Sequence, residues 1–131
     1  MSQLSKYLVV RNYLGAQVQS VSGLGNVDVR YGETIGDELR PAAYVMLDGE
    51  IETEQEYMGF MSSAKLTLGF NVQYQAEETF LNNLDDLVAT IDANGYTACG
   101  VEFLWVSGIK WESINKDVSK AVITVSTRYS T

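Results

Sequence analysis

Apolar and polar residues alternate most regularly between residues 64 and 74. The apolar members of this run are Ala64, Leu66, Leu68, Phe70, Val72 and Tyr74. Lys65, Thr67, Asn71 and Gln73 stand between them. A period of two is typical of a β-strand with one buried face. We therefore predict a strand here whose second face is polar or lies at an interface.

Two other stretches repeat apolar residues every three or four positions, as amphipathic helices do. The first covers about residues 3–14, and Gly15 is expected to end it in a left-handed turn. The second covers residues 76–93, and Asn94-Gly95 is expected to stop it. Its apolar stripe consists of Phe80, Leu84, Leu87, Val88 and Ile91.

Shorter alternating runs predict further strands. Residues 15–40 are rich in glycine and read as a long loop in which only Asn26–Tyr31 alternates. A strand follows over residues 40–49, because Pro41 is tolerated at a strand's first residue and Asp48-Gly49 is a turn signal. Two more strands are expected at residues 101–105 and 121–129.

The order of helix, loop, strands, helix and two strands indicates an α+β fold. We expect a mostly antiparallel sheet of about four to five strands with two helices packed on it. The chain has 131 residues and 46% apolar residues, which predicts a single ordered domain over 1–131.

Acidic residues are concentrated in one segment, where Asp48, Glu50, Glu52, Glu54 and Glu56 occupy every second position. If the segment is extended, all five side chains point the same way. One interpretation is a solvated edge strand whose charges prevent edge-to-edge aggregation. The other is a hairpin arm with one functional acidic face and one contact face.

Large apolar residues next to this segment are candidates for a subunit or partner interface. Tyr57, Met58, Phe60 and Met61 would form a cluster at the base or tip of the arm. Trp111 falls in an expected loop over Gly108–Ser119, as a lid on the sheet edge or as an interface anchor. Aromatic residues and methionine are also ordinary core residues, so the cluster at 57–61 does not by itself decide for an interface.

Charge and composition exclude several classes of partner. The formal net charge is −8, so binding of nucleic acid or anionic lipid through a basic face is disfavoured. No apolar run approaches the ~20 residues that span a bilayer, and the N-terminus does not read as a secretory signal. Cys99 is the only cysteine and is interpreted as a small packed side chain. We expect a protein that is made in a cytoplasm and has no membrane partner.

Catalytic chemistry is not indicated. The chain has no histidine, which removes the Ser-His-Asp and Cys-His arrangements and the commonest metal ligand. The acidic run lacks the sharp-turn glycine of a calcium loop, and nothing selects a catalytic pair of carboxylates. We therefore predict that the protein is not an enzyme and has no catalytic, cofactor-binding or metal-binding residues.

Four phrases, in the order in which they occur, carry a resemblance to a known family. They are Arg40-Pro41-Ala42-Ala43-Tyr44-Val45, then residues 65–72, then residues 81–91, then residues 121–125. Together with the order of elements over most of residues 1–129, they make the chain resemble the tail-terminator proteins of long-tailed bacteriophages. The chain departs from that pattern in its acidic residues 48–56 and its glycine-rich residues 15–36.

The resemblance implies a structural virion protein of the tail or neck, assembled in the host cytoplasm. Such proteins form a hexameric ring that caps the head-proximal end of the tail tube and stops its polymerisation. The implied partners are the tail tube protein and a head-completion or connector protein, with DNA as non-specific cargo through the lumen. Asp48, Glu50, Glu52, Glu54 and Glu56 could then line the DNA channel and repel the DNA.

Two alternatives stay open at this point. The chain could be another phage neck or tube component, or a small dimeric α+β protein that binds a ligand between its sheet and helices. The dimer predicts a deep apolar cavity, whereas the ring predicts a largely filled core.

Overall fold

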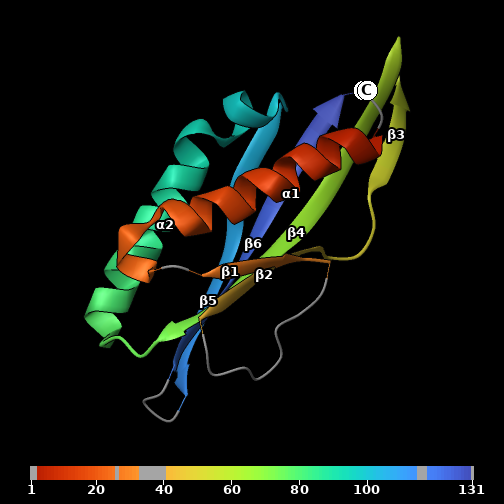
Figure 1. Ribbon diagram of the computed structural model, residues 1–131. Coiled ribbons are helices and arrows are strands. Elements are labelled where there is room, and N and C mark those ends of the chain that lie inside the picture. The colour runs from red at the N-terminus through yellow and green to blue at the C-terminus, as the bar shows by residue number, and fades with distance from the viewer. Residues whose placement is uncertain (1–2, 26, 33–40, 115–117, 131) are drawn as a thin grey trace.

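A computed structural model describes residues 3–25, 27–32, 41–114 and 118–130. The elements in chain order are α1 (Gln3–Ser20), the 3-10 turn η1 (Ser22–Leu24), β1 (Asp28–Tyr31), β2 (Ala42–Leu47), β3 (Glu52–Glu56), β4 (Gly59–Gln73), α2 (Glu77–Cys99), β5 (Phe103–Ile114) and β6 (Val118–Ser130). The strands form one sheet, and both long helices lie on the same face of it (Figure 1). This confirms the predicted α+β class.

The sheet has six strands, with the order β1-β2-β4-β6-β5 and with β3 also paired to β4. Only β1 and β2 run parallel, and all other pairs are antiparallel. Strand β4 is long enough to pair with β3 through its first residues and with β2 through Leu66–Asn71. Strands β2 and β3 therefore follow each other along one edge of β4. The sixth strand, beyond the expected four to five, is the acidic segment itself.

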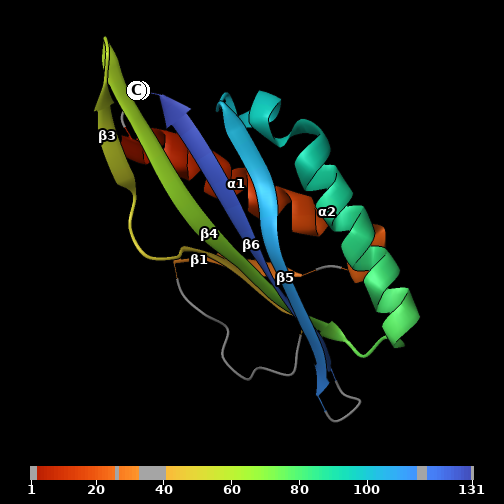
Figure 2. The ribbon, with the colours of Figure 1, turned by 180° about the vertical axis from the view of Figure 1, so that it is seen from behind.

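The predicted alternation decides which face of the sheet is buried. Along β4, Leu66, Leu68, Phe70 and Val72 are buried against the helices. Their side chains meet Leu14 of α1 and Phe80, Leu87 and Ile91 of α2 in a continuous core, in which Phe70 and Phe80 pack edge to face. None of the described helices covers the opposite face (Figure 2), which we call the open face.

Helix α1 continues through Gly15 to Ser20, so the expected end at Gly15 is wrong. Gly15 is buried against the side chain of Tyr31 in β1, and a β-carbon at Gly15 would collide with the tyrosine hydroxyl. Arg11 lies one turn earlier, with its guanidinium carbon 4.5 Å from the centre of the Tyr31 ring. The glycine allows the strand to approach the helix and does not terminate it. Asn26 and residues 33–40 of the expected loop lie outside the described residues.

Helix α2 likewise runs past Asn94-Gly95 and ends at Cys99. A side chain at Gly95 would meet Leu104 of β5, so this glycine too serves a close contact. The helix ends instead at Gly100, which has a left-handed φ of 65° and whose N–H bonds back to the last turn.

Strand β5 extends to Ile114, which contradicts the loop expected over Gly108–Ser119. Its outer half pairs with β6, including Trp111 opposite Ala121 and Glu112 opposite Lys120. An irregularity in register between Val106 and Gly108 interrupts the apparent alternation. Beyond this bulge, the hairpin of β5 and β6 projects past the helices. Polar residues occur there, so this part of the sequence resembles a loop.

Candidate assembly surface

Strand β3 and the start of β4 form a two-stranded arm that projects from one end of the sheet (Figure 1). Met61 of β4 pairs with Ser130, the last residue of β6, so Gly59 and Phe60 lie beyond the end of β6. All five residues of β3 are exposed. This is the hairpin predicted from the acidic segment.

The arm has two different faces. Thr53 shares a hydrogen bond of 3.0 Å with Ser62, which stands opposite Tyr129 in the sheet. Tyr129 is buried, and its hydroxyl donates to the backbone oxygen of Gln3 in α1 over 2.9 Å. Thr53 therefore marks the helix side. By strand alternation, Glu52, Glu54 and Glu56 project from the open face.

Asp48 and Glu50 precede β3 in the bend that contains Gly49. The run of five acids is thus three strand residues and two bend residues, not one continuous strand. Asp48, Glu50 and Glu52 nevertheless come together, because they line a groove of about 620 Å³ on the open face.

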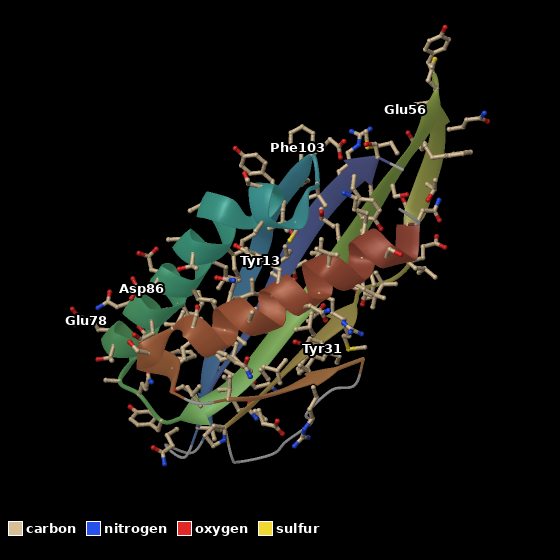
Figure 3. All side chains as sticks on the ribbon, turned by 45° about the horizontal axis from the view of Figure 1, so that its top comes forward. Tyr13, Tyr31, Glu56, Glu78, Asp86 and Phe103 are labelled. Carbon is tan, nitrogen blue, oxygen red and sulfur yellow. The ribbon has the colours of Figure 1, made fainter. Side chains whose placement is uncertain are left out.

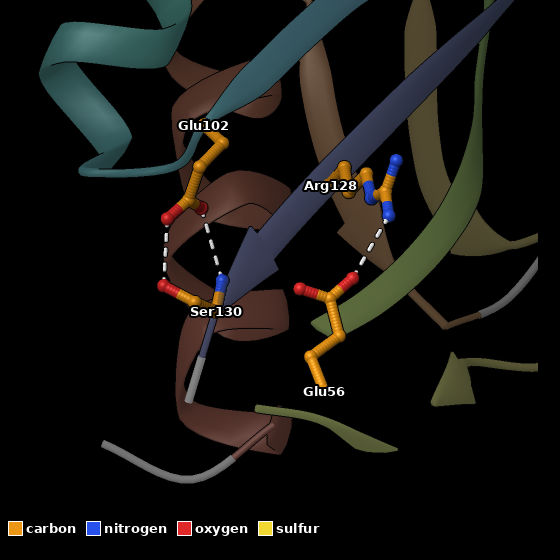
Figure 4. Close-up of polar contacts among 4 residues, drawn as sticks. All are labelled: Glu56, Glu102, Arg128 and Ser130. Atoms are coloured by element: carbon orange, nitrogen blue, oxygen red, sulfur yellow. Dashed lines mark hydrogen bonds and ion pairs between the residues drawn. The ribbon is translucent and has the colours of Figure 1, made fainter. Parts of the chain in front are cut away.

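This groove also contains groups of the opposite sign. Lys65, Trp105 and Arg128 line it together with the acidic residues. A guanidinium nitrogen of Arg128 lies 3.4 Å from a carboxylate oxygen of Glu56, and both side chains are partly exposed (Figure 4). An ion pair of this kind is worth little in water, roughly 0–1 kcal/mol. It joins the arm to β6 but does not neutralise the arm.

The tip of the arm is apolar and solvent-exposed. Tyr57 is 96% exposed and Met58 is 89% exposed, while Phe60 is 47% exposed and Met61 is partly buried. Met58 has a φ of 70°, the only positive φ outside glycine among the described residues. That conformation is unfavourable for a side chain other than Gly, Asn or Asp. A large apolar residue thus stands where the turn itself favours glycine.

Trp111 is not part of this surface. It lies in β5 and is 45% exposed, like its near neighbour Ile109. Trp111 stands opposite Ala121, which pairs with Phe70 of β4, so Trp111 lies at the level of Phe70 in the sheet. From Gly59 to Phe70 a strand rises roughly 36 Å. The predicted interface residues therefore occupy two separate ends of the molecule.

An aromatic patch lies at the start of β5, where no motif in the sequence marks it. Phe103 is 56% exposed and Trp105 is 46% exposed, and their rings form an edge-to-face pair at 6.4 Å. With Tyr96 of α2 they line a hollow of about 490 Å³, which we call the aromatic patch. Figure 3 labels Phe103, at the start of β5. Leu104, between them in sequence, is the buried residue. The alternation was visible, but it does not reveal which of its two faces is buried.

Two titratable groups near the patch have shifted pKa values. The Ser130 hydroxyl and backbone N–H donate to Glu102 over 2.6 and 2.9 Å (Figure 4), and the hydroxyl bond is the main reason that the pKa of Glu102 is lowered. Burial raises the pKa of Cys99 to about 11. The Cys99 thiol is therefore neutral and shielded at ordinary pH.

In the described part of the chain, no three His, Cys, Asp or Glu side chains gather closely enough to hold a metal ion. None of the helices described has the length and apolar character needed to cross a membrane.

The fold is similar to that of a solved structure. A chain from the "Virion of native gene transfer agent (GTA) particle" aligns with 96% of this chain and 92% of its own length. The sequence identity is 14% and the TM-score is 0.46. No family model matches the chain, and no curated protein matches it.

Proposed function

We propose that this protein is a non-catalytic structural subunit of a phage-like virion, which assembles as a hexameric tail-terminator ring. The observation that carries the proposal is the projecting two-stranded arm, with exposed Tyr57 and Met58 at its tip. Large apolar side chains held this far into water are typical of surfaces that a partner covers.

The packing of the interior also supports an assembly role. Leu14, Phe70 and Leu87 fill the space between sheet and helices, and each is 0% exposed. A small-molecule binding protein needs a hollow of about 300–1,000 Å³ at such a place. Among the described residues, grooves of this size lie on the open face, at the aromatic patch and beside η1, and each of them opens to the surface.

The charge of the arm fits a channel for DNA. Glu52, Glu54 and Glu56 project from the open face, and all three are exposed. In the proposed ring this face of the arm lines the lumen, where carboxylates repel phosphates and keep DNA from adhering. The ring caps the head-proximal end of the tail tube and contacts a head-completion or connector protein.

The test is the mass of the protein in solution over a concentration series, followed by electron microscopy with and without purified tail tubes. A six-subunit ring with a central hole, alone or on the tube end, is the expected result. Tubes that continue to grow after the protein is added would contradict the terminator role. A stable dimer that does not bind tubes would contradict the ring as well.

A further inference from the structure

Two apolar surfaces are left uncovered at one end of the sheet. The first is the arm tip with Tyr57 and Met58, and the second is the aromatic patch with Tyr96, Phe103 and Trp105. At this end the strands are ordered β3-β4-β6-β5, so the arm lies at one edge and the patch at the other. Three strand spacings separate β3 from β5, about 14 Å.

This arrangement makes the two surfaces different and places them on opposite edges of each copy. The arm continues β4 outward past the end of β6, away from β5 (Figures 1 and 3). A contact between tip and patch is therefore a contact between two copies. It is heterologous, since each copy presents one tip and one patch. Repetition of such a contact gives a ring where the rotation between copies closes, and an open filament where it does not.

The chemistry of the two surfaces is complementary. Methionine packs favourably on aromatic rings, and tyrosine combines a large apolar ring with a polar end. The arm is acidic, because residues 48–64 contain five acids and no lysine or arginine. The patch is bordered by Lys6, whose ammonium donates to the Gly100 oxygen, and by Arg128, which stands opposite Phe103 and is paired with Glu56 of its own copy. Glu102, the acid at the patch, already accepts two hydrogen bonds from Ser130.

The backbone of the tip is an independent indication that its side chain has a role. Met58 has a φ of 70°, a left-handed conformation that is unfavourable for a residue other than glycine. The next residue, Gly59, is a glycine, yet the position with the positive φ is occupied by methionine. Strain of this sort persists at sites where the side chain serves another purpose.

We infer that the arm tip of one copy packs into the aromatic patch of the next copy, with Met58 and Tyr57 against Phe103 and Trp105. The inference rests on the proposed ring and specifies its subunit contact.

The test uses cysteine pairs in the full-length protein. Met58→Cys protein is mixed with Phe103→Cys protein under mild oxidation, and disulfide-linked dimers are counted on a non-reducing gel. Native Cys99 stays in place, because it is buried and its thiol is neutral. The matched control replaces the second partner with Glu78→Cys, an exposed position in the first turn of α2.

We expect the Met58→Cys and Phe103→Cys mixture to give at least fivefold more linked dimer than the control mixture. Equal yields in the two mixtures would overturn the inference. Electron microscopy of the unmodified protein with tail tubes is run in parallel. Rings without specific cross-links leave the proposed function standing and remove this contact, whereas specific cross-links without rings do the reverse.

A second pair of variants measures the contact without cysteine chemistry. Tyr57→Ser combined with Met58→Ser should raise the concentration needed for assembly at least tenfold. Tyr74→Ser removes a tyrosine that is 45% exposed and lies outside the arm, and it should leave assembly unchanged. Equal effects of the two changes would show that general loss of apolar surface, and not the tip, weakens assembly.

Discussion

The glycines of this chain have two different structural roles. Gly49 and Gly100 have φ values of 86° and 65°, so they supply turns that a side chain would strain. Gly15 and Gly95 lie inside helices and face Tyr31 and Leu104, respectively. The neighbour that requires each of these two glycines comes from a later element of the chain. The sequence pattern therefore predicted the turn at Gly49, did not single out Gly100, and took both contact glycines for helix ends.

A substitution at Gly15 separates these two roles. Alanine favours a helix over glycine by about 1 kcal/mol, so helix propensity alone predicts that Gly15→Ala stabilises the protein. We expect the opposite, a loss of about 1–3 kcal/mol in the free energy of unfolding, because the new methyl group collides with Tyr31. Urea denaturation measures this change. The control Ala16→Gly, at an exposed position of the same helix, should cost about 1 kcal/mol.

The tip of the arm should show a trade between stability and assembly. Met58→Gly relieves the positive φ and is expected to raise the free energy of unfolding by up to about 1 kcal/mol. The same change removes the apolar side chain and should weaken assembly. Thermal unfolding and sedimentation measure the two effects. Tyr57→Gly is the control, because that residue has no positive φ to relieve and should not gain stability.

Glu102 should give a measurable pH dependence. Hydrogen bonds from Ser130 lower its pKa in the folded state, so its contribution to stability is present above the ordinary glutamate range. That contribution is lost as the pH falls through the lowered pKa. Glu102→Gln should be slightly less stable than the native protein at pH 7, with the difference shrinking below about pH 4.3. The effect is small because the side chain is exposed.

Unfolding curves of both proteins between pH 7 and pH 3 test this prediction. Glu54→Gln removes the same charge from the arm, away from Ser130, and serves as the control. A difference between Glu102→Gln and native protein that stays constant over the whole range would contradict it.

At the scale of elements, the long strand β4 and the arm were predictable because their patterns are local. Alternating apolar residues and a run of acidic residues can each be recognised within one short stretch of sequence. Strand β5 was predicted too short, since Lys110 and Glu112 are exposed on a hairpin that projects past the helices. The start of β5 was recognised, but which side holds Phe103 and Trp105 depends on where the helices pack. That information comes from the tertiary structure and not from the local sequence.

The acidic face of the arm should act on DNA and not on assembly. Glu52→Lys combined with Glu54→Lys places positive charge on the open face, where it attracts phosphate. We expect slower DNA passage through reconstituted particles, with rings still formed. Time-resolved release of labelled DNA measures the rate. Glu77→Lys with Glu78→Lys makes the same charge change on α2 and should leave passage unchanged.

Loss of rings in the arm double variant would contradict the lumen assignment. It would place Glu52 and Glu54 in a contact between copies. In that case the charge change on α2 is again the comparison, because it separates a local effect from one of net charge.

For the molecule as a whole, the fold class and the core could be read from sequence, whereas the contact surface could be read only in part. The tip residues Tyr57 and Met58 were recognised as candidates, and the structure exposes them. Trp111 was grouped with them, although it lies at the other end of the sheet. A single amino-acid sequence does not show how far apart in space two residues lie when they are distant in the chain.

The position of β6 has a consequence for the order in which the chain folds. Strand β6 is the last element in sequence, yet it lies between β4 and β5 and pairs with both along its length. During synthesis, the ribosome releases β4 and β5 before their shared partner exists. Their backbone groups can be satisfied only when Val118–Ser130 has emerged, so the sheet closes late. A polypeptide interrupted before Val118 lacks the middle of its sheet. A chain that ends before Val118 is therefore expected to be unable to form the sheet that carries the arm and the aromatic patch.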